Sequence, residues 1–268
     1  GLANDCVYEY NTIERNYAVD PLNHNDGFQS WSIGSDGVVG HGTLSNVTLR
    51  GNKIIAVSDP TQPLPGSMQG IGNFSGLYDG WIVENNLVIT NGQYHGITFY
   101  GATNCRIVNN TVVKSALDPS GVTPWIGIFA HQVDNGPYSG VVSTNNIVRN
   151  NLSTALNLSG TYTADNNTTV TTGYAAYFAD YAGFDFHLKA GSPAVDVGDT
   201  TLAPTTDLDQ NARTAPYDRG CYELVSVVPA VPQAPSGLAA TGGNAQVTLG
   251  WNAAAGAASY NVKRSVVS

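Results

Sequence analysis

An asparagine-anchored unit recurs four times in the first half of the chain and restricts the folds open to it. Each copy is a short strand of alternating apolar and polar residues that ends at an asparagine, with a further apolar residue two positions on. The anchors, separated by 41, 34 and 24 residues, are Asn11, Asn52, Asn86 and Asn110. Period-two alternation predicts half-buried strands, and a strand motif repeated at such intervals predicts a solenoid of stacked coils.

The anchors have a structural explanation, because stacked asparagines at a tight turn can hydrogen-bond along the stack. A second strand follows each anchor, and the four copies begin at Gly27, Gly70, Gly96 and Gly127. Aligning these glycines predicts one buried column, made of Phe28, Ile71, Ile97 and Ile128. The asparagine signal continues at 145–153 and 165–170.

Composition sets limits on function. A chain of 268 residues with 42% hydrophobic and 12% charged residues is expected to fold. A net charge of −9 with only 11 Lys and Arg disfavours binding of nucleic acid, and no apolar run is long enough to span a membrane.

Cys6 and Cys105 fall in one inward column, three coils apart. Three coils correspond to about 14 Å, which is too far for a disulfide, so both are predicted to be free, buried thiols.

The NNTV and NNLV repeats with their GIT-type strands resemble the right-handed parallel β-helix proteins of the pectin-lyase-like superfamily over residues 1–175. Residues 184–223 resemble the choice-of-anchor closing segment that follows such helices in bacterial secreted proteins. The resemblance implies an all-β fold, with a right-handed parallel β-helix over 1–224. It also implies a secreted or cell-surface location, although the N-terminal residues lack a signal-peptide pattern.

A Pro- and Ala-rich linker is predicted at 225–236, since composition shifts there. Residues 237–268 resemble the first strands of a fibronectin type III module, with Trp251 and Tyr260 at matching places. A full sandwich of this kind takes about 100 residues, so we expect only a partial β-sandwich. We expect a monomer that forms part of a longer multidomain chain.

Loop lengths predict a groove at one corner of the solenoid. Between anchor and second strand, coils one, two and four carry long inserts, whereas coil three has the brief segment TNGQYH. Coil three would then form the floor and expose some of Tyr94, His95, Thr98 and Tyr100. Long solenoid grooves suit extended polymers, and loops on a rigid scaffold often carry function.

Polar residues converge on this corner in two predicted columns. One holds Asp26, Gln69, His95 and Ile126, and the other holds Arg15, Ala56, Thr90 and Lys114. A base, a cation and an acid are what proton abstraction beside a uronate carboxylate requires. The base would be Lys114 or His95, the acid Tyr94 or Tyr100, and the neutralising cation Arg15 or Arg106. The catalytic candidates are Lys114, His95, Asp26, His24 and Tyr94, and the substrate-binding candidates are Arg15, Gln29, Gln69, Tyr100, Arg106, Trp125 and His131.

Each candidate also has a purely structural interpretation. His95 could cap a strand, Lys114 could be a solvated turn lysine, and Asp26 could bond turn amides. Trp125 could stack on sugars or pack beneath a long loop. Glu9, Arg50 and Glu84 alternate in charge on successive coils and are interpreted as a structural ladder.

The sequence therefore predicts a polysaccharide lyase or C5-epimerase acting on a uronate polymer such as alginate or pectin, with enzymatic activity itself left open. One alternative is an inverting glycoside hydrolase built on Asp20, Asp26 and Asp118. The other is a non-catalytic adhesin or glycan-binding module. The segments NDG and GHG are similar to polygalacturonase motifs, but the paired aspartates and the Arg-Ile-Lys of that family are absent. No metal site is predicted, and calcium is left open as a cofactor. Residues 207–211 have calcium-loop spacing, but Ala212 replaces the glycine of an EF-hand, so an EF-hand is not expected.

Overall fold

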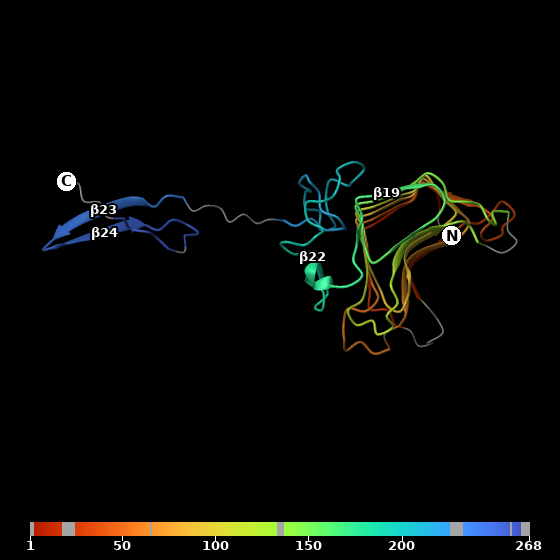
Figure 1. Ribbon diagram of the computed structural model, residues 1–268, viewed down its shortest axis with the longest axis horizontal. Helices are drawn as coiled ribbons and strands as arrows, with labels where there is room; N and C mark the ends of the chain where they lie inside the picture. Colours follow the sequence, from red (N-terminus) through yellow and green to blue (C-terminus); the bar gives the residue numbers. More distant parts are fainter. Residues whose placement is uncertain are drawn as a thin grey trace. The chain divides into compact units, whose positions relative to one another are not determined.

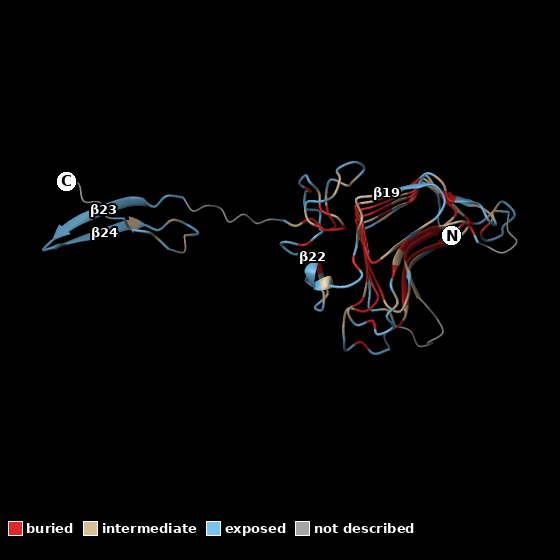
Figure 2. Cartoon of the chain, in the orientation of Figure 1, coloured by how far each residue is buried: buried red, intermediate tan, exposed pale blue. Residues whose placement is uncertain are grey.

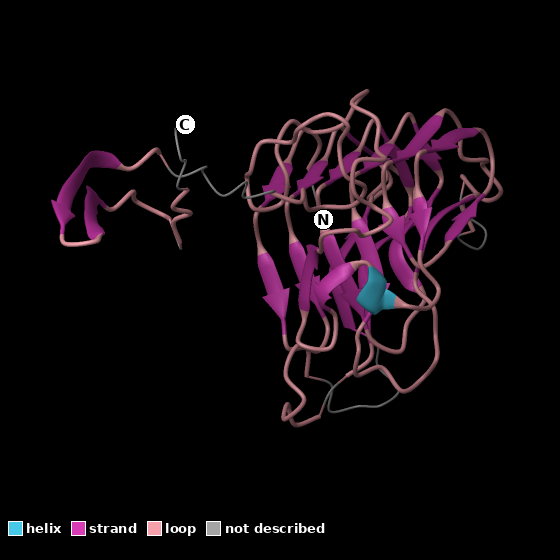
Figure 3. Ribbon diagram, turned by 60° about the vertical axis from the view of Figure 1, so that its left-hand side comes forward, coloured by secondary structure: helices cyan, strands magenta, loops and turns pink. Residues whose placement is uncertain are grey.

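The computed structural model describes residues 3–17, 25–64, 66–132, 137–225, 233–257 and 259–263. The chain divides into two compact units, residues 1–224 and 225–268. The first unit is a parallel β-helix, in which strands from successive coils overlay one another in Figure 1. Strands are the main regular elements of the described residues, and the 3-10 turn η1 (Tyr174–Ala176) is drawn in cyan in Figure 3. The predicted all-β solenoid is therefore confirmed.

Four parallel sheets, here named A to D, run along the stack. Sheet A contains β1 (Val7–Glu9), β5 (Thr48–Arg50), β9 (Ile82–Glu84), β13 (Arg106–Val108), β16 (Asn146–Arg149) and β19 (Tyr162–Asp165). Sheet B contains β2 (Thr12–Glu14), β6 (Lys53–Ile55), β10 (Leu87–Thr90), β14 (Thr111–Lys114), β17 (Leu152–Ser153) and β20 (Thr168–Thr169). Sheet C contains β3 (Asn25–Trp31), β7 (Met68–Ser75), β11 (His95–Tyr100), β15 (Trp125–Phe129) and β18 (Leu156–Leu158). Sheet D contains β4 (Thr43–Ser45), β8 (Leu77–Asp79) and β12 (Ala102–Thr103).

The predicted asparagine ladder is present at the turn between sheets A and B. Each amide nitrogen donates to the side-chain oxygen of the next anchor at 2.9–3.0 Å, through Asn11, Asn52, Asn86, Asn110, Asn151 and Asn167. The same oxygens also accept backbone N–H groups, for example that of Asn86 on Asn110. The residue before an anchor is left-handed, such as Asn109 with φ 52°, a conformation that Asn and Gly adopt most readily. The ladder thus satisfies the backbone of a turn that repeats in every coil.

The core lies between the sheets, where the inward side chains of successive coils stack; the strands of the solenoid are largely red in Figure 2. The predicted glycine column comes just before the inward apolar residues of β3, β7 and β11, and steric contacts explain why it is glycine. A Cβ on Gly27, Gly70 or Gly96 would lie 2.1–2.3 Å from the side chain of Ile54, Val88 or Val112. The three cysteines are free, as predicted for Cys6 and Cys105. Cys105 and Cys221 are buried, whereas Cys6, which was predicted to be buried, is half-buried.

The predicted alignment of coil four is wrong. Ile97 pairs with Ile126 rather than Ile128, and His95 pairs with Trp125, because the register shifts between His95 and Ile97. A bulge at this point leaves Gly96 without a counterpart in coil four. Ile126 and Ile128 both remain buried, since a shift of two residues keeps the same faces inward.

The segment after the last coil covers the outer face of sheet B. It carries β21 (Phe178–Asp180) and β22 (Asp185–Leu188), which pair antiparallel. Its apolar residues, among them Phe186 and Cys221, form a second core with the outward side chains of sheet B, such as Ile89 and Val113. Asn109 donates from its side chain to the backbone carbonyls of Asp218 and Gly220, so the asparagine-rich turns also hold this segment.

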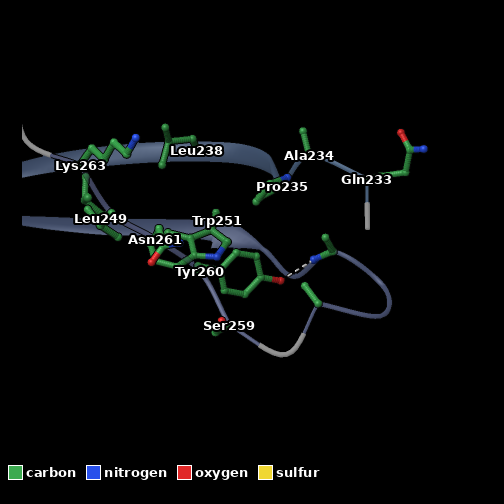
Figure 4. A pocket seen from close by; sticks show the side chains of 13 residues that line it. Gln233, Ala234, Pro235, Leu238, Leu249, Trp251, Ser259, Tyr260, Asn261 and Lys263 are labelled. Atoms are coloured by element: carbon green, nitrogen blue, oxygen red, sulfur yellow. Dashed lines mark hydrogen bonds between the residues drawn. The ribbon is translucent and has the colours of Figure 1, made fainter. Parts of the chain in front are cut away.

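In the second unit, β23 (Ser236–Gly243) and β24 (Gln246–Asn252) form an antiparallel hairpin. Beside it lies a cavity of about 590 Å³, shown in Figure 4. The ring centroids of Trp251 and Tyr260, which line this cavity, are 5.4 Å apart. The Tyr260 hydroxyl accepts the Ala254 N–H at 2.7 Å. Leu238 is 71% exposed on this hairpin, so its apolar face is open in the described part of the chain.

Candidate functional site

Aromatic side chains lie side by side on the outer face of sheet C. Tyr100 of β11 pairs with Phe129 of β15, and Phe74 occupies the same row on β7. The ring centroids of Tyr100 lie 5.5 Å from Phe74 and 5.2 Å from Phe129, the latter nearly parallel at 29°. These three residues alternate with inward core positions, since side chains along a strand point to opposite faces.

A second group of rings lies at the start of the same strands. His95 is 5.0 Å from Phe74 and 5.6 Å from Trp125 by ring centroid. Tyr94, just before β11, lies 4.4 Å from His95 and 4.6 Å from Trp125. We name the whole set the aromatic cluster, which consists of Phe74, Tyr94, His95, Tyr100, Trp125 and Phe129.

Glycines let these rings lie close to the sheet. A Cβ on Gly72 would lie 2.5 Å from the ring of Phe74. A Cβ on Gly127 would lie 2.6 Å from Phe129 and 2.9 Å from Trp125. The rings therefore pack on the backbone of these glycines, where a side chain would leave no room for them. Together they form a continuous surface. At its far end is an open depression of about 270 Å³, lined by Phe74, Ser75, Tyr100 and Gln132.

Two groups in the cluster can take part in proton transfer. The Nδ1 atom of His95 lies 3.1 Å from Thr98 Oγ1, and this contact orients the imidazole. Burial, with a smaller contribution from Tyr94, raises the pKa of the Tyr100 hydroxyl, so Tyr100 is a neutral donor at pH 7. The ring centroids of His95 and Tyr100 are 6.5 Å apart.

Three predicted polar residues form one row across neighbouring strands. Asp26 of β3 pairs with Gln69 of β7, and His95 follows on β11. Strands about 4.8 Å apart place Asp26 roughly 10 Å from His95. Trp125 takes the fourth position of this row, which the sequence alignment gave to Ile126. Gln29 is exposed on β3, whereas Thr98 is completely buried, which corrects its assignment to an exposed floor.

The predicted cations do not belong to this face of the solenoid. Arg106 lies in sheet A, where it pairs with Glu84 at 3.5 Å. Glu84 also binds Arg50 at 2.7 Å, and Arg50 reaches Glu9 at 3.3 Å. The charge ladder is thus confirmed and gains Arg106, whose proposed role beside His95 does not fit its position.

Arg15 and Lys114 lie at the ends of β2 and β14, where the chain leaves sheet B for sheet C. Arg15 contributes to lowering the pKa of the Asp59 carboxyl, after the hydrogen bonds from Thr61, and so lies near that loop. The backbone carbonyl of Lys114 accepts the Tyr181 hydroxyl at 2.9 Å. Lys114 is the last residue of β14 and Arg15 directly follows β2, so both lie at the predicted corner, on the side of sheet B.

One predicted histidine, His131, does not contribute to the cluster. His131 is 1% exposed, and its Nε2 accepts the Gly76 N–H at 2.9 Å, which requires an unprotonated nitrogen. Burial lowers the pKa of His131, in agreement with a neutral structural role. His24 lies outside the described residues.

Of the three carboxylates of the alternative hydrolase, the structure describes Asp26 and Asp118. Asp118 is buried, and its two oxygens accept the N–H groups of Ser120 at 2.8 Å and Gly92 at 3.1 Å. Asp118 therefore has a turn-forming role, and Asp20 lies outside the described residues. In the described part of the chain, no group of three or more His, Cys, Asp or Glu could hold a metal. Asp207 of the calcium-like segment accepts N–H groups at both oxygens.

Phe74 and Phe129 were missed from the sequence. The available signal was the outward position of each second strand, which is aromatic in three successive coils. Phe129 was hidden by the two-residue error in coil four, because that alignment placed it opposite Thr98 and not opposite Tyr100.

No protein-family model matches this sequence, and no curated protein matches it. Among the described residues, no helix is long and apolar enough to cross a membrane.

Proposed function

We propose that this protein binds an extended polysaccharide on the outer face of sheet C, with sugar rings packed on the aromatic cluster. The observation that carries the proposal is the row of Phe74, Tyr100 and Phe129 on three neighbouring strands, with Trp125 and Tyr94 beside it. Aromatic rings offer large apolar faces, and Tyr and Trp add polar edges that can bond hydroxyl groups. The resemblance to pectin-lyase-like β-helix proteins supports the same substrate class.

A charge argument favours stacking over electrostatic attraction. The chain carries a net charge of −9, and the arginines of sheet A are already paired with carboxylates. A polyanion would therefore gain little from the protein as a whole, and binding would depend on ring contacts. The contacts would be insensitive to salt for this reason.

The experiment uses the full chain and a panel of neutral and uronate polysaccharides, with binding measured by calorimetry in low and high salt. Tyr94→Ala removes an exposed ring of the cluster, and Tyr162→Ala removes an equally exposed ring on sheet A; the two side chains are 44% and 45% exposed. We expect Tyr94→Ala to weaken binding about 5- to 20-fold, as losing one stacked ring does. Equal loss in both variants, or no binding by the parent protein, would refute the proposal.

A uronate lyase or C5-epimerase is a second candidate, favoured by the position of His95 between Tyr94 and Tyr100. His95 would remove the proton beside the carboxylate, and the neutral Tyr100 would donate to the leaving oxygen or to the opposite face. Arg15 and Lys114, at the sheet B corner, would have to supply the neutralising charge for this chemistry.

Absorbance of unsaturated uronides separates the candidates. A rise with the parent protein that His95→Gln abolishes, while binding persists, would support the lyase. Reducing ends without that absorbance would point to hydrolysis. Binding with neither product would leave a glycan-binding module, the adhesin alternative.

A further inference from the structure

A second concave site lies at the corner where the chain passes from sheet B to sheet C. It has a volume of about 360 Å³ and is formed by the loops of coils two, three and four. We name it the corner pocket; its lining residues are Val57, Asp59, Pro60, Gln62, Asn91, Leu117 and Pro119. The short loop of coil three contributes Asn91 between the longer loops of its neighbours. The predicted floor residues Tyr94, His95 and Tyr100 do not line this pocket.

Gln62 presents a buried acceptor here. Its side chain is 6% exposed, and its Nε2 donates to the backbone carbonyl of Asn16. That bond uses the amide nitrogen as a donor, which leaves the amide oxygen Oε1 as the acceptor of the side chain. Oε1 has no hydrogen-bond partner among the described residues. The Gln62 N–H donates to the Asp59 carbonyl at 3.0 Å, which holds the residue in place. Because Oε1 is itself buried, a molecule in the pocket can donate to it only after the Gln62 side chain moves toward the pocket. That bond would satisfy an acceptor that lacks a donor among the described residues.

The neighbouring polar groups are acceptors as well. Asn91 donates its amide nitrogen to the Gly66 carbonyl at 2.9 Å, which leaves its side-chain oxygen available. The Asp59 carboxylate is held by Thr61, whose N–H and hydroxyl donate to one oxygen at 2.8 and 2.7 Å. Val57, Leu117 and the two prolines supply apolar walls.

Acceptors between apolar walls match a sugar ring, which donates through its hydroxyl groups and packs through its C–H faces. A calcium ion is a poorer match, because it takes six to eight oxygens and this pocket offers one carboxylate. We propose that the corner pocket is a second sugar-binding site, which reads hydroxyl donors of one unit of the glycan through Gln62.

This proposal rests on the proposed function, since both sites would hold one polymer. Asn91 of the corner pocket precedes Tyr94 of the aromatic cluster by three residues. Their Cα atoms are therefore at most about 11 Å apart. A polymer that leaves the corner pocket along the coil-three loop reaches the aromatic cluster directly.

The test follows two sets of NMR signals in the full chain during titration with methyl hexosides: the methyl groups of Val57 and Leu117, and the indole of Trp125. We expect saturable shifts of the methyl signals. Gln62→Met should raise the dissociation constant at the methyl groups about 5- to 10-fold, as loss of one hydrogen bond does. Because this change could loosen the loop, Leu117→Arg provides a second variant that fills the pocket from an exposed wall.

Leu64→Arg is the matched control, since Leu64 is 57% exposed on the coil-two loop and does not line the pocket. Shifts of the Val57 methyl groups that vanish in Leu117→Arg but persist in Leu64→Arg would support the corner pocket. Shifts confined to Trp125 would overturn it and leave the aromatic cluster intact. Shifts confined to the methyl groups would support the pocket and overturn the cluster, and a hydrated pocket would leave all methyl signals unmoved, which overturns the proposal.

Discussion

Replacing one rung of the asparagine ladder should destabilise the solenoid in proportion to the depth of that rung. Asn110 is completely buried, and its Oδ1 is the partner of the Asn86 backbone N–H at 3.0 Å. Asn110→Ala leaves that N–H without a partner, at a cost of about 1–3 kcal/mol. It also breaks bonds to Val83 O, Asn151 Oδ1 and Asn86 Nδ2, about 1 kcal/mol each. The total is about 4–6 kcal/mol, a large part of the stability of a typical domain.

The comparison is Asn11→Ala at the exposed end of the ladder. Asn11 donates to Asn52 Oδ1 through a part-buried bond and to the Glu9 carbonyl through an exposed one, and together these bonds contribute about 1 kcal/mol. Urea unfolding of the full chain, followed by far-ultraviolet circular dichroism, gives both differences from the midpoints and slopes. If Asn110→Ala stays within about 1 kcal/mol of Asn11→Ala, the ladder does not hold the coils together and the reasoning fails.

Three further changes test the packing, the closing segment and the pH response. Gly96→Ala places a Cβ 2.2 Å from Val112 and should lower the melting temperature, whereas Gly242→Ala meets open space and should not. Arg213→Met leaves Glu223 buried without its cation and should cost about 3 kcal/mol in urea unfolding; an unchanged midpoint contradicts this. Burial lowers the pKa of His187, but hydrogen bonds to Asp209 and Asp185 outweigh it and raise the pKa overall. This stabilisation should be full below about pH 6.5 and fade above it, by less than about 1 kcal/mol, and His187→Gln should abolish the difference between pH 6 and 8.

The sequence predicted those parts of the fold that depend on local repetition. Period-two alternation and the asparagine spacing located the strands of sheets A, B and C, because each coil buries the same positions. The error in coil four shows the limit of that reasoning. Gly96 and Gly127 look equivalent in the sequence, but Gly96 avoids Val112 in the core, whereas Gly127 lies beneath the rings of Trp125 and Phe129 on the outer face. Two glycines with different steric causes cannot be distinguished by pattern alone.

The candidate site was predicted less well, because it depends on which sheet faces which neighbour. Tyr94, His95, Tyr100 and Trp125 were found as candidates, and the structure gathers them. Arg106 was assigned to the same groove by chemistry, yet its place in sheet A follows from the strand that carries it. Apolar runs such as LVIT in β10 signal burial on both faces, which the covered sheet B explains.

The outer faces of the three large sheets have different occupants, and this difference narrows the location of the site. Sheet A carries a ladder of charges that runs from Glu9 to Arg106, and each of these charges is paired with another. Sheet B is covered by the closing segment. Sheet C presents half-buried aromatic rings around His95, and neither paired charges nor the closing segment accounts for them. Exposed rings gathered on one face are more often functional than scattered ones. A ligand with apolar faces and hydroxyl edges would cover the outer face of sheet C, as the closing segment covers that of sheet B.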